Sequence, residues 1–309
     1  MSTTHLALVG PTASGKTRIA LEVARALGDV EIVSVDSMQL YRGLDIGTAK
    51  PTAAERAEIV HHLVDIADPS EEWSVARFQT AAREAVTAIE GRGHRALLVG
   101  GAGLYVQAVV DDLRFPGEDL ELRAGLEAWT TEPGGVAAAY AELSERDPDA
   151  AGRIDPHNAR RIVRALEVIR LTGQPFSSFG PGVRHFGPTA FPVRMAGIWM
   201  PRGALAERIR ARFAAMRAAG LLDEVRRLAA TNGGLSRTAR QAIGYKELLA
   251  HLEGQEPSAD AAFETAIRRT RSFARRQRMW FRRDPRIAWY GSAGNPATVF
   301  PGLLASWSR

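Results

Sequence analysis

Short apolar runs recur in the first hundred residues, separated by polar or amphipathic stretches. Three segments built around such runs, Leu6–Val9, Glu31–Val35 and Arg95–Val99, have the length and branched residues typical of buried strands. Apolar residues at helical spacing follow the first segment up to Gly28 and fill residues 74–91. Strands that alternate with helices in this way predict an α/β fold with a parallel sheet.

The pattern changes near residue 113. Alanine-rich helical segments at 118–129 and 135–146 follow, and little strand pattern returns before residue 193. We therefore expect an all-helical insertion domain within an α/β core. The predicted boundaries are 1–112 for the first part of the core, 113–194 for the insertion and 195–309 for the second part of the core.

The last part of the chain predicts a loop, a strand and a long helix. Residues 173–192 are rich in Gly, Pro and Ser and return the chain to the core, where Ile198–Met200 forms a last strand. The helix at about 203–230 carries an apolar stripe of Leu205, Ile209, Phe213 and Met216. It also carries Arg208, Arg210, Arg212 and Arg217. Because Arg208 adjoins the stripe, we expect it to turn inward and the other three arginines to be solvated.

The segment Gly10–Thr17 directly follows the first strand and reads G-x-x-x-x-G-K-T. Between a strand and a helix this spacing is a P-loop: its backbone N–H groups wrap a phosphate, Lys16 adds positive charge and the Thr17 hydroxyl can hold Mg²⁺. The following helix points its positive end at the same anion. We therefore expect a parallel sheet core of the P-loop NTPase type. The expected phosphate contacts are Gly10, Thr12, Ala13, Ser14, Gly15, Lys16 and Thr17. The motif leaves open whether the phosphate belongs to ATP.

The second and third predicted strands are followed by different kinds of residue. Asp36 follows the second strand, at the sheet edge where open α/β sheets bind ligands, although a turn or helix cap is an alternative role for it. The third strand ends in Gly100 and Gly101, where an ordinary P-loop ATPase has its Mg²⁺-holding acid. His61 and His62 are adjacent, so they point apart, and we do not expect them to bind a metal.

Composition excludes several classes of protein. The chain has 309 residues, 45% of them hydrophobic, which is enough for a substantial core. It has no cysteine, and therefore no disulfide or thiolate zinc site. It shows neither a leader peptide nor an apolar run long enough to span a bilayer, so we expect a soluble, cytoplasmic protein and, by default, a monomer.

Positive charge is concentrated near the C-terminus. Between Ile267 and Arg286, nine arginines stand against one acid, Asp284, with aromatic residues interleaved. A nucleic-acid backbone is the expected partner, and a membrane surface is the rival that the few aromatic residues disfavour. Farther upstream, Asp155 and Pro156 predict the start of a helix that runs to about Leu171. Arg160 and Arg164 lie one turn apart on it and could grip a polyphosphate, but a solvated face next to Glu167 is slightly favoured.

Taken together, several segments resemble the bacterial tRNA dimethylallyltransferase family. They are Gly10–Thr17, Asp36–Pro51, His61–Asp65, Gly100–Tyr105, Arg153–Pro156, Arg161–Glu167, Arg208–Phe213, Gln241–Glu247 and Arg275–Gln277. The resemblance spans residues 6 to about 286, and Asp36–Pro51 is far more specific than the P-loop.

The resemblance implies transfer of a dimethylallyl group from dimethylallyl diphosphate to N6 of the adenosine 3′ of a tRNA anticodon, position 37. In such an enzyme the P-loop holds the donor diphosphate and ATP is not consumed, which explains the missing acid after the third strand. Asp36 would be the general base toward N6. Lys16, Thr17 with Mg²⁺, the loop amides and Arg208 would stabilise the departing diphosphate.

The resemblance also implies how tRNA is held. The target adenine would be turned out of its stack and lined by Asp36, Ser37, Met38 and Gln39. The segment with Arg160, Arg161 and Arg164 would contact the anticodon stem-loop. Ala102 stands where the family commonly has Thr or Ser, so a hydroxyl contact to tRNA must be missing or replaced there.

Three other functions remain as alternatives. A small-molecule kinase with ATP on the P-loop accounts for residues 6–36 and nothing beyond. An adenylate isopentenyltransferase shares the chemistry, but the helical insertion and the basic C-terminal segment favour a larger anionic acceptor. An RNA-binding protein with a vestigial P-loop is disfavoured by the intact Lys16, Thr17 and Asp36.

Overall fold

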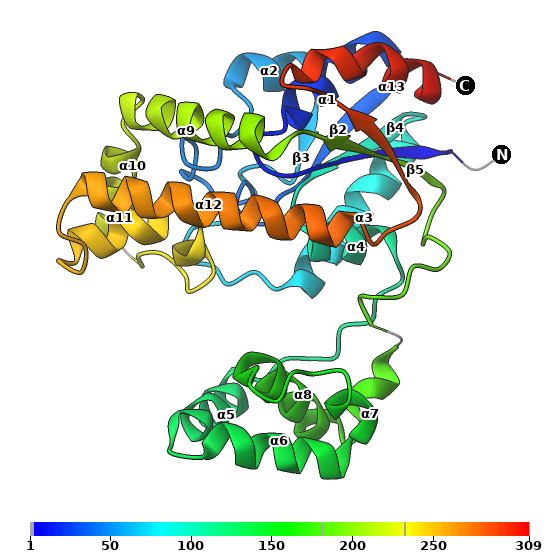
Figure 1. Cartoon of the computed structure of the whole chain (residues 1–309). Helices are drawn as coiled ribbons and strands as arrows, with labels where there is room; N and C mark the ends of the chain where they lie inside the picture. Colours follow the sequence, from blue (N-terminus) through cyan, green and yellow to red (C-terminus); the bar gives the residue numbers. More distant parts are fainter. Residues whose placement is uncertain (1–2, 181, 232, 309) are drawn as a thin grey trace. The chain divides into compact units, whose positions relative to one another are not determined.

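The computed structural model describes residues 3–180, 182–231 and 233–308, and the chain forms two compact units (Figure 1). The larger unit is made of Met1–Asp111 and Pro188–Arg309, and the smaller of Asp112–Gly187. The second boundary lies earlier than the predicted residue 194, because the chain already pairs with the larger unit before that point. Thr189 forms an antiparallel bridge with Asp111, and the His5 N–H donates to the Pro192 carbonyl at 2.9 Å.

A six-stranded sheet forms the centre of the larger unit, and its strands run in the order β3-β2-β4-β1-β5-β6. The strands are β1 (His5–Val9), β2 (Val30–Val35), β3 (His61–His62), β4 (Arg95–Gly100), β5 (Val193–Trp199) and β6 (Ile287–Gly291). All neighbouring pairs are parallel. Every residue of β1 and β2 is buried, which explains their nearly continuous apolar sequences. The predicted α/β class with a parallel sheet is confirmed.

The carboxyl ends of three adjacent strands create the functional edge of this sheet. In the order β2-β4-β1, these strands lead into Asp36, Gly101 and the P-loop. The prediction of a last strand at Ile198–Met200 was wrong in two respects. The strand begins earlier, at Val193, and β6 follows it at the outer edge of the sheet. Only the first residue of β6 is buried, so its sequence lacks a strong apolar signal.

Helices cover both faces of the sheet. Those of the larger unit are α1 (Lys16–Leu27), α2 (Ala53–Glu58), α3 (Val75–Gly91), α4 (Gly103–Val110), α9 (Arg202–Ala218), α10 (Leu221–Ala230), α11 (Tyr245–Leu252), α12 (Ala259–Phe281) and α13 (Phe300–Trp307), with single 3₁₀ turns at Ala239–Gln241 and Pro296–Val299. On one face, α1 and α13 pack together over an apolar cluster with Leu8, Ile19 and Trp307 (Figure 1). The larger cluster on the other face includes Phe78, Phe213 and Phe281, from α3, α9 and α12.

The single helix expected at 203–230 is two helices, α9 and α10. The break lies at Gly220, whose φ of +89° is in the left-handed region that favours glycine. The chain therefore turns at this residue, and α10 packs against both α9 and α11.

The smaller unit is entirely helical. It contains α5 (Leu120–Thr131), α6 (Gly135–Arg146), α7 (Pro148–Ala151), α8 (Ala159–Thr172) and a 3₁₀ turn at Phe176–Phe179. The helix predicted to start at Asp155 starts at Ala159 instead, because Asn158 caps it by accepting the Arg161 N–H at 3.2 Å. Asp155 accepts the His157 N–H and closes a separate turn.

A buried charge organises this helical unit. Glu167 of α8 is fully buried and accepts hydrogen bonds from Arg123 of α5 at 2.9 and 3.0 Å and from the Asp119 N–H at 3.0 Å. Burial alone opposes ionisation, but the bonds from Arg123 and Arg164 keep the pKa of Glu167 below its ordinary value. Glu167 therefore joins α5 to α8 and is not a solvated neighbour of the arginines.

Within residues 3–180, 182–231 and 233–308, no helix combines the length and apolar character needed to cross a bilayer.

Candidate active site

The P-loop joins β1 to α1 in a conformation that its glycines allow. Gly15 has a φ of +86°, a backbone conformation that favours glycine. A Cβ added there would also lie 2.4 Å from Cγ of Pro296, so both the backbone conformation and the lack of space exclude a side chain. No side chain caps α1 in the described structure, and the first N–H groups of a helix have no acceptor within it. The start of α1 therefore presents free donors and the positive end of the helix dipole to an anion.

Two of the expected phosphate contacts are partly engaged within the protein. The Thr12 N–H donates to Oε1 of Gln277 at 2.8 Å, and the Ser14 N–H donates to the Pro11 carbonyl at 3.2 Å. Thr12 lines the cavity in front of the P-loop, whereas Ser14 and Gly10 are not in its wall. The Ser14 hydroxyl is buried and, among the described residues, has no hydrogen-bond partner.

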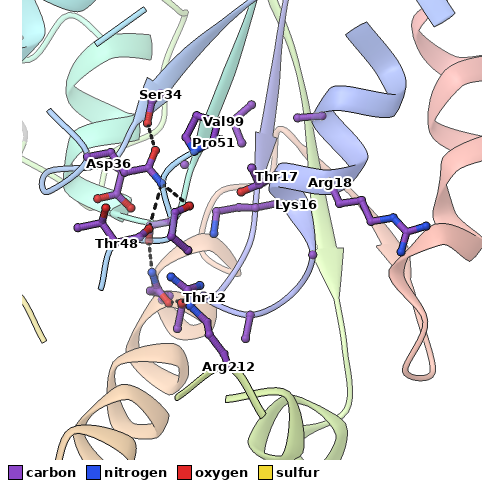
Figure 2. Close-up of a pocket in the computed structure, with 18 of the residues that line it drawn as sticks. Thr12, Lys16, Thr17, Arg18, Ser34, Asp36, Thr48, Pro51, Val99 and Arg212 are labelled. Atoms are coloured by element: carbon purple, nitrogen blue, oxygen red, sulfur yellow. Dashed lines mark hydrogen bonds between the residues drawn. The ribbon is translucent and has the colours of Figure 1, made fainter. Parts of the chain in front are cut away.

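A cavity of about 490 Å³ opens in front of the P-loop. Its wall includes Thr12, Ala13, Gly15, Lys16, Thr17, Asp36, Gln39, Thr48, Gly101, Arg208, Arg212, Phe273 and Gln277. Figure 2 shows the Lys16 side chain running toward the part of the wall that carries Asp36 and Thr48, whereas Arg18 extends away from it. Arg18 is exposed and pairs with Glu22.

A second cavity, of about 350 Å³, adjoins the first. The two share six lining residues, which are Thr12, Asp36, Thr48, Arg212, Phe273 and Gln277. The wall of the second cavity also contains the apolar residues Met38, Ala102, Phe213, Met216, Ala242 and Ile243, together with Ser37, Gly47, Gln241, Thr270 and Arg276. Asp36 thus lies where the chamber that carries the P-loop meets a chamber with a largely apolar wall.

The charges around Asp36 shift one another's pKa values. Burial lowers the pKa of Lys16 to about 8, with Asp36 opposing this change and Arg212 adding to it. Burial also lowers the pKa of Arg212, again against the attraction of Asp36. Two desolvated cations thus face one carboxylate, so the electrostatics of this chamber favour an anion.

Comparison with known proteins decides the family. The IPP transferase family model matches residues 39–284, and the isopentenyl transferase model matches residues 3–64. A tRNA dimethylallyltransferase of Salinispora arenicola is 50% identical over 306 residues, 99% of this chain and 86% of that protein. Another, from Streptomyces coelicolor, is 47% identical over 301 residues, 97% and 94% of the two chains. The chain belongs to the IPP transferase family.

Solved structures of IPP transferases agree in fold. The tRNA isopentenylpyrophosphate transferase of Bacillus halodurans superposes with a TM-score of 0.71 at 39% identity, over 99% of this chain and 95% of that one. A eukaryotic dimethylallyltransferase acting on tRNA gives a TM-score of 0.77 at 26% identity, over 94% and 74% of the two chains. The resemblance inferred from the sequence motifs is therefore confirmed along nearly the whole chain.

Arg208 and Arg212 of α9 both line the donor-side chamber of this IPP transferase, the cavity that carries the P-loop. Arg208 donates from Nε to the Ala13 carbonyl at 2.8 Å, and Arg212 donates to the Thr12 hydroxyl at 3.3 Å. The prediction that Arg212 is solvated was wrong. The signal was present in the sequence, because Arg212 lies four residues after Arg208 and so shares its helix face.

Gln277 of α12 was not predicted as a site residue beyond its place in a family segment. It is 5% exposed, accepts the Thr12 N–H and donates to the Gly101 carbonyl at 2.7 Å. A Cβ on Gly101 would lie 2.6 Å from Nε2 of Gln277 and 3.3 Å from Nζ of Lys16. Gly101, which directly follows β4, therefore makes room for the amide that joins the P-loop to α12.

The residues expected around the target base divide between the two chambers. Asp36 accepts the Met38 N–H at 2.9 Å, so it closes a turn as well as facing the cavity. Ser37, Met38 and Ala102 line the second chamber, hereafter the acceptor-side chamber. Gln39 lines the donor-side chamber instead, and its Oε1 accepts the Ser34 hydroxyl at 2.7 Å.

The predicted tRNA-contacting arginines of the insertion lie in the smaller unit. Arg160 and Arg161 are exposed at the start of α8. Arg164 pairs with Glu167 and donates to the Pro116 carbonyl at 2.8 Å, so it also supports the local fold. Within the larger unit, Arg275 and Arg276 of α12 are exposed.

His61 and His62 are each engaged within the sheet region. His61 contacts the Ile59 carbonyl at 2.7 Å, and His62 pairs with Glu31 at 2.7 Å. Among the described residues, no cluster of three or more His, Asp or Glu side chains could hold a metal ion.

Proposed function

We propose that this chain transfers a dimethylallyl group from dimethylallyl diphosphate to N6 of adenosine 37 in tRNA, releasing diphosphate. The observation that carries the proposal is the position of Asp36, which lines both the P-loop chamber and the adjoining chamber with apolar walls. A base at such a junction can reach an acceptor in one chamber while a donor diphosphate occupies the other. The names of the relatives support the same donor and acceptor classes.

Deprotonation is the first requirement of the reaction. The exocyclic amine of adenine is a weak nucleophile, because its lone pair is delocalised into the ring. Asp36 would accept a hydrogen bond from N6 and then its proton as the new carbon–nitrogen bond forms. The two electrons of the breaking carbon–oxygen bond leave with the diphosphate, and the allylic carbon tolerates the positive character that develops.

Charge stabilisation of the leaving group is the second requirement. Lys16, Arg208 and the amides at the start of α1 border the donor-side chamber and would bind the diphosphate oxygens. Arg212 lies between the chambers and would stabilise negative charge from the other side. These contacts strengthen as charge accumulates on the departing diphosphate, so they act on the transition state more than on the bound substrate.

The oxygen groups that the protein offers in this chamber could hold Mg²⁺ only together with oxygens of the bound diphosphate. The Thr17 hydroxyl and the Asp36 carboxylate are the hard oxygen groups offered by the P-loop and the end of β2, and Mg²⁺ commonly combines one or two such groups with phosphate oxygens and water. When bound, Mg²⁺ would neutralise charge on the diphosphate. We assign Thr17 as the protein group that would hold it.

The tRNA would approach the acceptor-side chamber, which Ser37, Met38 and Ala102 line. The target adenine has to leave its stack to enter. Arg160, Arg161 and Arg164 of the insertion and Arg275 and Arg276 of α12 are the proposed backbone contacts. We further propose that the enzyme works as a monomer in the cytoplasm.

The direct test is incorporation of label from dimethylallyl diphosphate into unmodified tRNA, with Mg²⁺ and without ATP. Free AMP and an ATP-hydrolysis assay run alongside. Label in tRNA alone is the expected result. Label in AMP would point to an adenylate isopentenyltransferase, and ATP turnover without label transfer would point to a kinase.

A further inference from the structure

A buried carboxylate outside both chambers holds the loop that lines them. Glu224 of α10 is 3% exposed and accepts three consecutive backbone N–H groups, from Asp45 at 3.2 Å, Ile46 at 2.9 and 3.1 Å and Gly47 at 3.3 Å. It also accepts the hydroxyl of Tyr245. Within the described part of the chain, Glu224 forms no ion pair. Backbone amides and a phenol therefore stabilise this buried group in place of a cation.

The geometry requires a carboxylate at this position. Successive N–H groups that converge on one point form a concave anion site. A glutamine would turn its NH₂ group, which is a donor, toward donors that are already buried, and would leave some of them unpaired. Glutamine has nearly the size of glutamate but lacks its charge, so Glu224→Gln would no longer hold the three backbone N–H groups.

Tyr245 fixes the same loop from a second helix. Its hydroxyl oxygen accepts the Gly47 N–H at 3.1 Å while the proton is donated to Glu224. A Cβ on Gly47 would lie 2.3 Å from the Tyr245 ring, so the backbone rests directly on the ring. Burial and the neighbouring Glu224 raise the pKa of Tyr245, which keeps the phenol protonated as a donor. The backbone of residues 45–47 is thus held by α10 and α11 together.

The held backbone leads directly into the wall of the site. Thr48 lines both chambers, and its carbonyl accepts the Gln39 amide at 3.1 Å, as the Ala49 carbonyl does at 3.3 Å. Gln39 in turn accepts the Ser34 hydroxyl. The bond to Ser34 of β2 holds the Gln39 side chain independently of residues 45–47. Of the two chambers, Gly47 lines only the acceptor-side one, so a shift of residues 45–47 changes that chamber first.

We propose that Glu224 is a positioning residue for the acceptor nucleotide. By binding the N–H groups of residues 45–47, it keeps Gly47 and Thr48, which line the acceptor-side chamber, in the geometry that receives the target base of tRNA. Glu224 lines neither chamber, so it acts through the loop and touches no substrate. This inference rests on the proposed transfer to tRNA.

The test compares Glu224→Gln with a matched variant of the same helix. Asp223→Asn is the control, because Asp223 is exposed and, among the residues that the structure describes, its side chain pairs only with Arg226. Three measurements are made on each: amide hydrogen exchange at residues 45–49 without substrate, the Kd for dimethylallyl diphosphate, and kcat and KM for unmodified tRNA. In Glu224→Gln we expect faster exchange and a loss of roughly ten- to a hundredfold in kcat/KM for tRNA, with the donor Kd within about twofold of wild type. The control should match wild type in all three.

Unchanged exchange at residues 45–49 would overturn the proposal, and so would equal losses in donor affinity and in tRNA turnover. Tyr245→Phe removes one hydrogen bond to the Glu224 carboxylate and one acceptor for the Gly47 N–H. It should therefore give faster exchange and a lower kcat/KM for tRNA, both by less than in Glu224→Gln, and it tests the proposal even if Glu224→Gln fails to fold. Exchange is measured without substrate. A wild-type enzyme that modifies no tRNA would therefore refute the proposed function, while the exchange data would still decide whether Glu224 holds the loop.

Discussion

The lowered pKa of Lys16 predicts that donor binding is linked to proton uptake. This pKa is about 8, so about half of the Lys16 side chains are neutral at pH 8 and about a tenth at pH 7. A bound diphosphate places negative charge beside the ammonium group and raises its pKa toward the ordinary value. Binding at pH 8 should therefore take up about half a proton per site.

The sign of the pH dependence follows from the same shift. Well below pH 8, Lys16 is charged in both the free and the bound enzyme and contributes no pH dependence. Above pH 8 the bound enzyme must acquire a proton that the free enzyme lacks. Donor affinity should therefore fall as the pH rises, by up to about tenfold per pH unit. Asp36 raises the pKa of Lys16, so Asp36→Asn should move the start of this fall to lower pH.

Isothermal titration calorimetry measures the uptake directly. Dimethylallyl diphosphate is titrated at pH 8 in two buffers that differ in ionisation enthalpy, and the difference in apparent binding enthalpy gives the number of protons bound. Lys16→Arg is the control, because a guanidinium stays charged in this range and should abolish the uptake. The reasoning is refuted if wild type takes up no proton at pH 8, or if the Arg variant takes up as much as wild type.

Three further predictions concern separate parts of the site. Asp36→Asn should lower single-turnover transfer to tRNA by roughly 10²–10⁴-fold at an unchanged melting temperature, and transfer at the wild-type rate would end its assignment as the base. Gln277→Ala leaves the buried Gly101 carbonyl and the part-buried Thr12 N–H without this partner, so urea unfolding should show a loss of about 1–3 kcal/mol, and a loss below about 0.5 kcal/mol would contradict this. Neutralising Arg275 and Arg276 should reduce the salt dependence of tRNA binding by up to about two phosphate contacts and leave donor binding intact. Arg210→Ala, on the exposed face of α9, is the control. Equal losses in the binding of tRNA and of the donor would assign the pair a structural role.

The parts of the site that could be predicted from sequence are those encoded locally. The P-loop, the buried strand before it and Asp36 after β2 lie in short segments whose pattern and spacing carry the signal. A parallel sheet then brings the ends of β1, β2 and β4 together without further information. The position of Asp36 beside Lys16 follows from these features alone.

The rest of the site depends on contacts between distant segments. Gln277 meets Thr12 across 265 residues, Arg212 meets the same residue across 200, and Glu224 meets Ile46 across 178. On α10 and α12 no local pattern encodes which polar face turns inward, because the apolar stripe of each helix leaves several orientations open for its neighbours. On α9 the spacing of Arg212 from Arg208 indicates a shared helix face, but it does not encode the partner in the P-loop. The edge strand β6 escaped prediction for a related reason, since its exposed positions weaken the apolar signal.

Gly101, which directly follows β4, distinguishes this P-loop from that of an ordinary ATPase. An acid at Gly101 would have to place its Cβ 2.6 Å from the Gln277 amide, and that amide holds the Thr12 N–H of the P-loop. The position that holds Mg²⁺ in ATPases is thus occupied here by a side chain from the C-terminal half of the chain. The P-loop is therefore completed by α9 and α12, which also line the acceptor-side chamber. Because the same two helices line both chambers, the proposed donor and acceptor sites depend on residues far along the chain from the P-loop, and this agrees with a family match that reaches residue 284.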